Sequence, residues 1–147
     1  MAGYFKKLDG HVYEGGYVAG EAMENGVFAE LVTANGATTV KKIAAAGSLE
    51  ARVEEKTTLW GRKAIVITVT APGTDVHYFV ENEWDDRNDP QYNESTHECK
   101  IGEYVKMRRP VLNDQMILTV TDAVYATLAV GDTVKPAAGG SVAKKSA

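Results

Sequence analysis

The stretch KAIVITVTAP, residues 63–72, decides the fold class of this chain. Ile65, Ile67 and Val69 alternate onto one face of the strand that it predicts, and the residues between them are also largely apolar. Because both faces are apolar, the strand belongs in the interior of a sheet. It ends at a Pro-Gly turn, after which residues 75–81 predict a second strand in a hairpin with the first.

The rest of the chain repeats this pattern of β-branched runs between turn signals. Further strands are expected in residues 25–36, which begin and end with Asn-Gly, and in 48–55, 103–110, 115–122 and 133–135. Helices are expected only in residues 38–47 and 121–131, the second with Asp122 as its N-cap.

The sum of these elements is a mainly β protein, a small antiparallel β-barrel or sandwich with one or two short helices and extended terminal arms. Residues 1–25 are read as a Gly-rich N-terminal arm, residues 26–135 as the β domain and residues 136–147 as a flexible C-terminal tail. The alternatives for the tail are a frayed end and a segment that adds a strand to a neighbour's sheet.

The composition of the chain excludes several classes of partner. The chain has 147 residues and a net charge of -4, and this charge argues against nucleic acid as a partner, since phosphate contacts need a basic face. No apolar run approaches the length that spans a bilayer, and residues 1–10 lack the apolar core of a signal peptide, so we expect no membrane partner. The single cysteine, Cys99, rules out an internal disulfide.

Two segments invite a chemical interpretation. Residues 81–98 hold seven acidic residues and one base, but Pro90 and Gln91 stand where a calcium loop from Asp86 needs a ligand and a glycine. His97 and Cys99 are two residues apart, with no motif for an orienting group or an oxyanion hole. We therefore expect no enzyme activity, no metal and no cofactor, and read the acidic segment as a solvated loop.

The candidate contact residues for a protein partner come from three segments. Trp84, in the acidic loop, either anchors that loop to the protein or contacts a partner. The basic side chains of Arg108 and Arg109 interact either with the acidic loop or with a neighbouring protein. The N-terminal arm adds side chains able to anchor it. The candidate interface residues are Val12, Tyr13, Tyr17, Val18, Trp84, Arg108 and Arg109.

Four segments, residues 19–36, 49–70, 102–120 and 128–144, together resemble the capsid decoration (cement) proteins of tailed bacteriophages. The likeness is one of layout: a Gly-rich start, a compact β domain, a late VGDTV turn and strand, and a short polar end. It implies a β-rich, β-tulip-like fold that clamps neighbouring major capsid proteins on the outer capsid surface. It also implies a homo-oligomer, usually a trimer, that is made in the host cytoplasm and carried on the virion.

Two alternatives remain beside this reading. The first alternative is another phage head, neck or tail component. The second is a small β-barrel module that binds a carbohydrate or another ligand. The aromatic residues available for such a ligand site are Tyr78, Trp84 and Tyr92.

Overall fold

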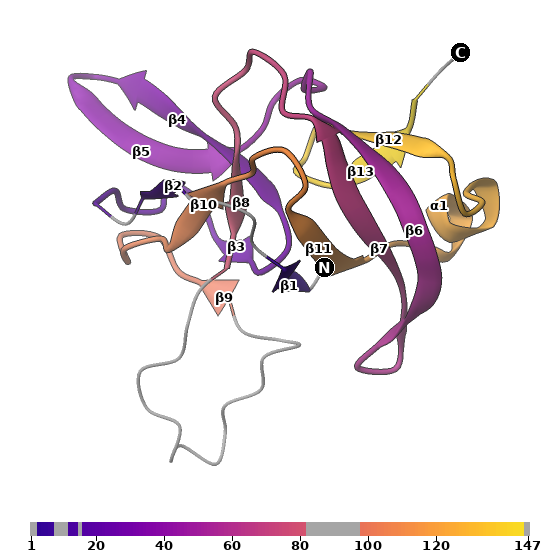
Figure 1. The fold of residues 1–147 in the computed structure, drawn as a ribbon. Helices are drawn as coiled ribbons and strands as arrows, with labels where there is room; N and C mark the ends of the chain where they lie inside the picture. The colour runs from indigo at the N-terminus through magenta and orange to yellow at the C-terminus, as the bar shows by residue number, and fades with distance from the viewer. Residues whose placement is uncertain (1–2, 8–11, 15, 82–97, 146–147) are drawn as a thin grey trace.

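The computed structural model describes residues 3–7, 12–14, 16–81 and 98–145. These residues form two antiparallel sheets and one short helix, so the prediction of a mainly β fold is confirmed (Figure 1). Of the two architectures expected, the sandwich fits, because the sheets are not closed into a barrel.

The larger sheet has six strands, and the predicted strand of residues 63–72 lies in its interior between two neighbours. Its strands, in spatial order, are β1 (Gly3–Lys7), β11 (Gln115–Thr119), β7 (Arg62–Ala71), β6 (Glu50–Leu59), β12 (Thr133–Pro136) and β13 (Val142–Lys144). We call this sheet A.

The second sheet, sheet B, has five strands, and a separate two-stranded ribbon lies beside it. Sheet B runs β2 (Val12–Glu14), β10 (Met107–Arg109), β8 (Tyr78–Val80), β4 (Phe28–Ala34) and β5 (Ala37–Lys42). The ribbon pairs β3 (Met23–Glu24) with β9 (Glu98–Cys99).

The main core lies between the two sheets. Ile65, Ile67 and Val69 of β7 are buried in it, as their alternation predicts. Sheet B contributes Phe28 and Phe79, whose rings meet edge to face with centroids 5.5 Å apart. Apolar burial of this kind is the main term that stabilises the folded chain.

A second core covers the other face of sheet B. Strand β8 shows the division, because Phe79 belongs to the main core while Tyr78 and Val80 belong to the second. Ala19 and Met23 of the N-terminal region and Val105 of the segment before β10 close this second core from outside. The part of sheet B around β8 is therefore buried on both faces, and residues 18–20, whose backbone bonds to Val40 of β5, help to cover the second face.

Both chain ends differ from the expected arms. In the N-terminal region, β1 pairs with β11 and β2 pairs with β10, so residues within 1–25 form edge strands of both sheets. In the C-terminal region, β13 pairs with β12, and Val142 is 2% exposed in the main core. The expectation of a flexible tail from residue 136 is thus corrected for residues 136–145, which belong to the folded sheet.

Two local predictions were wrong. Residues 38–47 were expected to be helical, but β5 runs through their first half and forms a hairpin with β4 across Asn35-Gly36. Strand β8 was expected to form a hairpin with β7, but it pairs with β4 and β10 in the other sheet.

The predicted C-terminal helix is confirmed as α1 (Asp122–Thr127), which packs Val124 and Tyr125 against the main core. Its N-cap is Thr121 rather than Asp122, because the Thr121 hydroxyl accepts a hydrogen bond from the Val124 amide at 3.3 Å. The first-turn Asp122 carboxylate remains well placed for the positive end of the helix dipole.

Candidate protein interface

The structure brings four of the predicted interface residues together in one strand pair. In the β2–β10 ladder, Tyr13 is the register partner of Arg108, and Val12 is the partner of Arg109. A strand alternates its side chains between faces, so Arg108 shares a sheet face with Phe79, and Arg109 shares the opposite face with Met107. The two arginines, both half-buried, therefore do not form one basic patch.

Tyr17 and Val18 lie next to this strand pair along a segment held by backbone hydrogen bonds on both sides. The Val105 amide donates to the Tyr17 carbonyl at 3.0 Å, and the Val40 amide of β5 donates to the Val18 carbonyl at 2.9 Å. Val18 also forms an isolated bridge with Tyr104. The segment is thus fixed between β5 and residues 104–105.

Two exposed apolar side chains that the sequence did not single out lie in the turn whose backbone pairs with Val18 and Ala19. Ile101 is 71% exposed and Tyr104 is 68% exposed, in the turn that connects β9 to β10. The Gly102 amide between them donates to the Ala19 carbonyl at 2.9 Å. We call the surface formed by Val18, Ile101 and Tyr104 the Tyr104 patch. Exposed apolar side chains gathered at one place are typical of a protein contact surface.

The turn beneath the Tyr104 patch is fixed by its own hydrogen bonds. The Glu103 amide donates to the Lys100 carbonyl at 3.0 Å, and the Lys100 amide donates back to the Glu103 carboxylate at 3.1 Å. The Cys99 thiol is buried under the turn, with its Sγ 3.6 Å from the Tyr104 carbonyl oxygen. A preformed turn of this kind lowers the ordering cost of binding.

The chemistry of Cys99 argues for a structural thiol. Burial, and secondly the negative charge of Glu103, raise its pKa to about 11. A thiol with so high a pKa is protonated at neutral pH and is a weak nucleophile. Its predicted neighbour His97 lies outside the described residues, as does Trp84 with most of the acidic loop.

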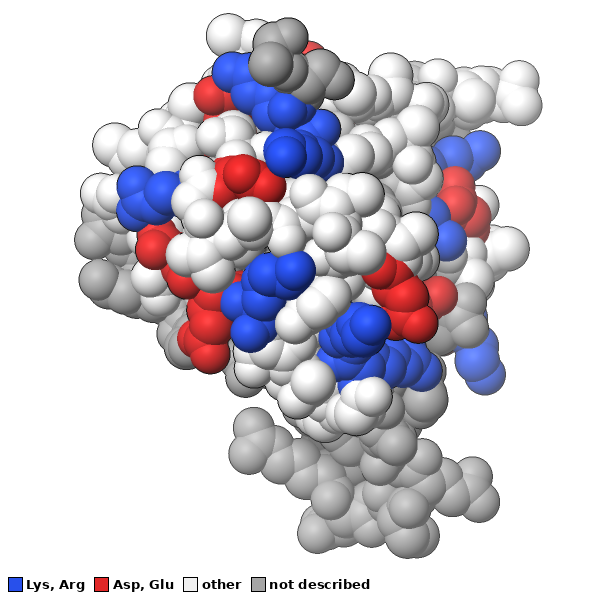
Figure 2. All heavy atoms as spheres, turned by 90° about the vertical axis from the view of Figure 1, so that its right-hand side faces the viewer, with Lys and Arg blue, Asp and Glu red and all other residues white. Residues whose placement is uncertain are grey.

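Within the described part of the chain, no three His, Cys, Asp or Glu side chains are placed to hold a metal ion. Figure 2 shows a face on which basic and acidic side chains are interspersed with uncharged surface. Ion pairs on the described surface include Lys144 with Asp132 (Nζ–Oδ2 3.3 Å) and Lys145 with Glu50.

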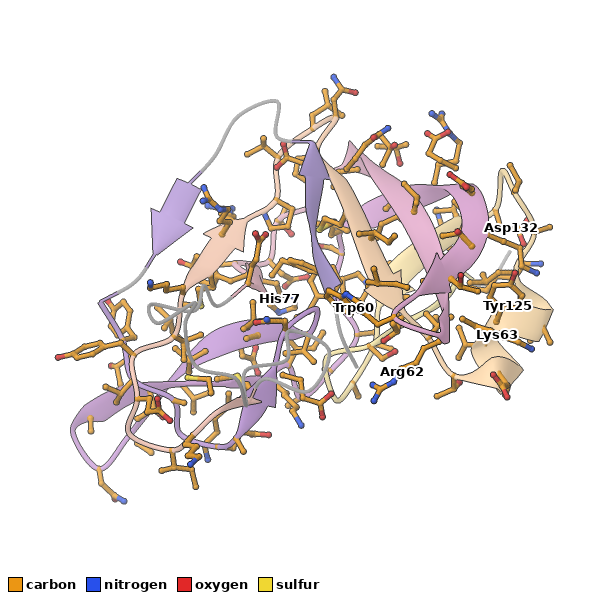
Figure 3. All side chains as sticks on the ribbon, turned by 90° about the horizontal axis from the view of Figure 1, so that it is seen from below. Trp60, Arg62, Lys63, His77, Tyr125 and Asp132 are labelled. Atoms are coloured by element: carbon orange, nitrogen blue, oxygen red, sulfur yellow. The ribbon has the colours of Figure 1, made fainter. Side chains whose placement is uncertain are left out.

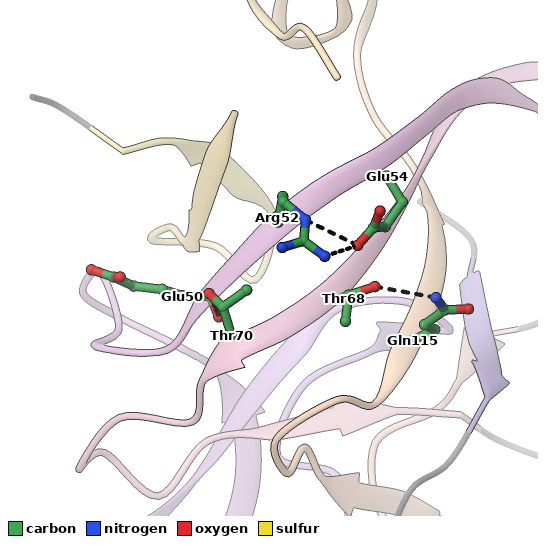
Figure 4. Close-up of polar contacts among 6 residues, drawn as sticks. All are labelled: Glu50, Arg52, Glu54, Thr68, Thr70 and Gln115. Atoms are coloured by element: carbon green, nitrogen blue, oxygen red, sulfur yellow. Dashed lines mark hydrogen bonds and ion pairs between the residues drawn. The ribbon is translucent and has the colours of Figure 1, made fainter. Parts of the chain in front are cut away.

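The part of the outer face of sheet A around Thr68 is less suited to docking, because its polar side chains already bond to one another (Figure 4). Arg52 Nη2 lies 2.6 Å from a Glu54 carboxylate oxygen. On the adjacent strands, the Gln115 amide nitrogen lies 3.2 Å from the Thr68 hydroxyl. A partner would have to replace these bonds, and the gain from replacing satisfied polar contacts is small.

The aromatic residues considered for a ligand site are not gathered on the described surface. Tyr78 is buried in the second core, where its register partner is Ala29. Trp84 and Tyr92 lie outside the described residues.

Comparison of the chain with protein-family models, curated proteins and solved structures gave no match. Across the described residues, no helix is long and apolar enough to cross a membrane.

Proposed function

We propose that this chain is a structural virion protein that binds the outer surface of a phage capsid and stabilises it by clamping neighbouring major capsid proteins. The observation that carries the proposal is the Tyr104 patch, which adjoins the edge strand pair β2–β10 where the selected interface residues gather. The resemblance in layout to capsid decoration proteins supplies the class of partner.

The patch supports a stable contact for two physical reasons. Burying an apolar side chain that is exposed in the free protein stabilises a complex by about 1.5–3 kcal/mol when burial is complete. Tyr104 and Ile101 are both mostly exposed, and the hydrogen-bonded turn holds them in place before binding. Tyrosine is also among the residues enriched at the centre of protein interfaces.

The first test is the abundance of the protein in purified particles. A copy number comparable with that of the major capsid protein supports decoration of the whole shell. A copy number that fits a single ring of subunits indicates a neck or tail component, which is the alternative within the same class.

The second test uses substitutions on the patch. Ile101→Ser and Tyr104→Ser together should weaken binding to expanded shells of the major capsid protein at least about tenfold, or about 1.4 kcal/mol. Val130→Ser is the matched control, because Val130 is 64% exposed in the turn after α1, away from the patch. Equal binding by the double variant and by Val130→Ser would show that the patch does not contribute to the interface.

Substitutions on the patch test the interface more specifically than a deletion of the N-terminal residues would. Strands β1 and β2 belong to the two sheets, and the buried side chain of Ala19 is part of the second core. A deletion of residues 1–20 would therefore change the fold and the interface together.

A further inference from the structure

The longest hairpin in the described part of the chain, β6–β7, ends in a two-residue turn of an unusual composition. Leu59 and Arg62 are register partners, so Trp60 and Gly61 form the turn between them. Their φ angles are 50° and 77°, close to the 52° and 76° of Asn35 and Gly36 in the β4–β5 hairpin. Positive φ at both central residues is the signature of a type I′ turn, for which Asn-Gly is a preferred pair.

Tryptophan is a poor residue for this position. Among the described residues, the non-glycine residues with positive φ are two asparagines, Asn35 and Asn113, and Trp60. Asparagine tolerates this conformation because its short polar side chain bonds to nearby backbone, whereas a bulky side chain there is strained. Strain of this kind is characteristic of functional sites, so a role for the Trp60 side chain outside the turn accounts for its presence.

The side chains around Trp60 have the composition of an interface anchor. The Trp60 side chain is 39% exposed, and the adjacent Arg62 is also exposed. Residues 59–63, LWGRK, carry two cations and no anion in a chain with a net charge of -4. Trp and Arg are the residues most enriched among those that dominate binding energy.

Helix α1 holds the base of this tip in position. The Lys63 ammonium lies 5.2 Å from the Tyr125 ring centroid and 3.8 Å from an Asp122 carboxylate oxygen. Lys56 lies over the same ring at 4.2 Å. Figure 3 shows Trp60, Arg62 and Lys63 around the end of the hairpin, with Tyr125 beside Lys63.

We propose that the β6–β7 tip, defined as Trp60, Arg62 and Lys63, is a second anchor for a protein surface that is acidic around an apolar pocket. The inference rests on the proposed function and extends it, because the acidic surface would belong to a capsid subunit adjacent to the one under the Tyr104 patch. The tip belongs to sheet A and the patch to the turn between β9 and β10, beside sheet B, and the two are well separated in Figure 1. Two separated contacts on one rigid body allow one molecule to bridge two subunits.

The observations favour a protein partner over a lipid surface. Firm attachment to a membrane takes several apolar side chains that enter the bilayer interface together. At this tip the described residue of that kind is Trp60 alone, and more than half of its side chain is already covered. A partly covered, fixed aromatic side chain suits a single pocket on a protein.

The decisive variant is Trp60→Asn, which gives the turn its preferred Asn-Gly pair while removing the indole. We expect the melting temperature to change little, because the relief of strain at positive φ offsets the loss of contacts made by the covered part of the indole. We expect binding to expanded shells of the major capsid protein to weaken at least about tenfold. A fall in the melting temperature would show that Trp60 serves the fold and would overturn the proposal.

The charge part of the proposal is tested with a matched pair of variants. Arg62→Gln and Lys144→Gln remove the same charge from exposed positions, but only Arg62 belongs to the tip. Arg62→Gln should weaken binding to the shells at low salt, and the difference should shrink in high salt. Equal effects of the two variants would overturn an acidic partner at the tip.

The outcomes separate this proposal from the function on which it rests. If the unaltered protein does not bind the shells, both are overturned. If it binds and Trp60→Asn binds equally well, only the anchor is overturned and the Tyr104 patch stands. Loss of binding to anionic lipid vesicles by Trp60→Asn, with unchanged binding to shells, would identify a lipid anchor instead and overturn the protein partner.

Discussion

The amide of Phe28, at the start of β4, donates a hydrogen bond of 2.8 Å to the carbonyl of Gly140, in the turn between β12 and β13. This bond joins sheet B to the C-terminal strands of sheet A. A second bond of the same kind runs from the Gly139 amide to the Ile43 carbonyl at 2.9 Å. The turn thus connects the two layers of the sandwich at one edge, and its two glycines permit separate tests.

Gly140→Ala should destabilise the protein more than Gly139→Ala. Both glycines have positive φ, 91° and 89°, so either alanine carries a strain of about 1–2 kcal/mol. Only at position 140 would the new Cβ also meet backbone, 2.9 Å from the Phe28 carbonyl oxygen, which adds about 1–3 kcal/mol of overpacking. Urea denaturation of the two variants gives the comparison, and equal losses would show that the close approach relaxes freely.

Deleting residues 137–147 should lower the free energy of unfolding by several kcal/mol. The deletion exposes the core position filled by Val142, which contributes about 1.5–3 kcal/mol, and leaves the edge of β12 without its partner strand. Thermal melting followed by circular dichroism measures the loss. Ala143→Ser, at an exposed position of β13, is the surface control and should change the melting temperature little.

The C-terminal strand was missed because composition is a poor guide to a short edge strand. Residues 136–147 contain few apolar side chains, and Val142 alone among the described ones is buried in the main core. The signal that the sequence does contain is Gly139-Gly140 between two Val-containing runs, which favours a hairpin. Its significance depends on contacts with Phe28 and Ile43, which are distant in the sequence.

The other two wrong predictions have different causes. In residues 38–47, the run of alanines after Ile43 favoured a helix, but the Asn35-Gly36 turn commits the following residues to pair with β4, and pairing outweighs propensity. For β8, the Pro72-Gly73 turn correctly ended β7, yet the next strand crosses to sheet B. The crossing segment is held by Ser48, whose amide donates to Asp75 at 2.8 Å, a contact that local patterns do not contain.

The candidate interface was predictable only in part. The aromatic and apolar residues of the N-terminal region marked Val18, which lies at the Tyr104 patch, and Tyr17, which packs against the second core. Ile101 and Tyr104 were missed because each stands alone among polar residues in KIGEY. Their significance arises when the fold pairs their turn with Val18 and Ala19, which are distant in the sequence.

Stability should fall in acid, and Asp132 should account for part of the fall. The Ala129 amide donates to its carboxylate at 2.9 Å, and this bond, aided by Lys144, holds the pKa of Asp132 below its ordinary value of 3.8. A carboxylate whose pKa is lower in the folded state stabilises the fold above the unfolded pKa and loses that contribution as the pH falls through the folded pKa. The loss is therefore expected below about pH 4.

Denaturation of the unaltered protein and of Asp132→Asn, from about pH 7 to about pH 3, measures this contribution. The variant should be less stable at neutral pH, and the two proteins should converge in acid, where the carboxylate of the unaltered protein becomes protonated. Asp75, whose pKa is lowered by its hydrogen bonds with Ser48, should cause some acid dependence that persists in the variant. A constant difference between the two proteins at every pH would contradict the assignment to the Asp132 charge.

Cys99 should react with iodoacetamide only when the β3–β9 ribbon opens. Its thiol is buried beneath the turn that carries Tyr104, and its pKa is raised to about 11, so little thiolate is present and reagent has little access to it. Alkylation of the native protein near neutral pH should therefore be far slower than alkylation in urea, as followed by mass spectrometry.

Because the thiol lies under the Tyr104 patch, binding to expanded shells should slow the reaction further, by holding the turn closed. Trp60→Asn provides the matched comparison, since in the unbound protein it should leave the labelling rate unchanged. Rapid alkylation of the native chain would show that the turn opens readily, and it would contradict the fixed patch on which the proposed contact depends.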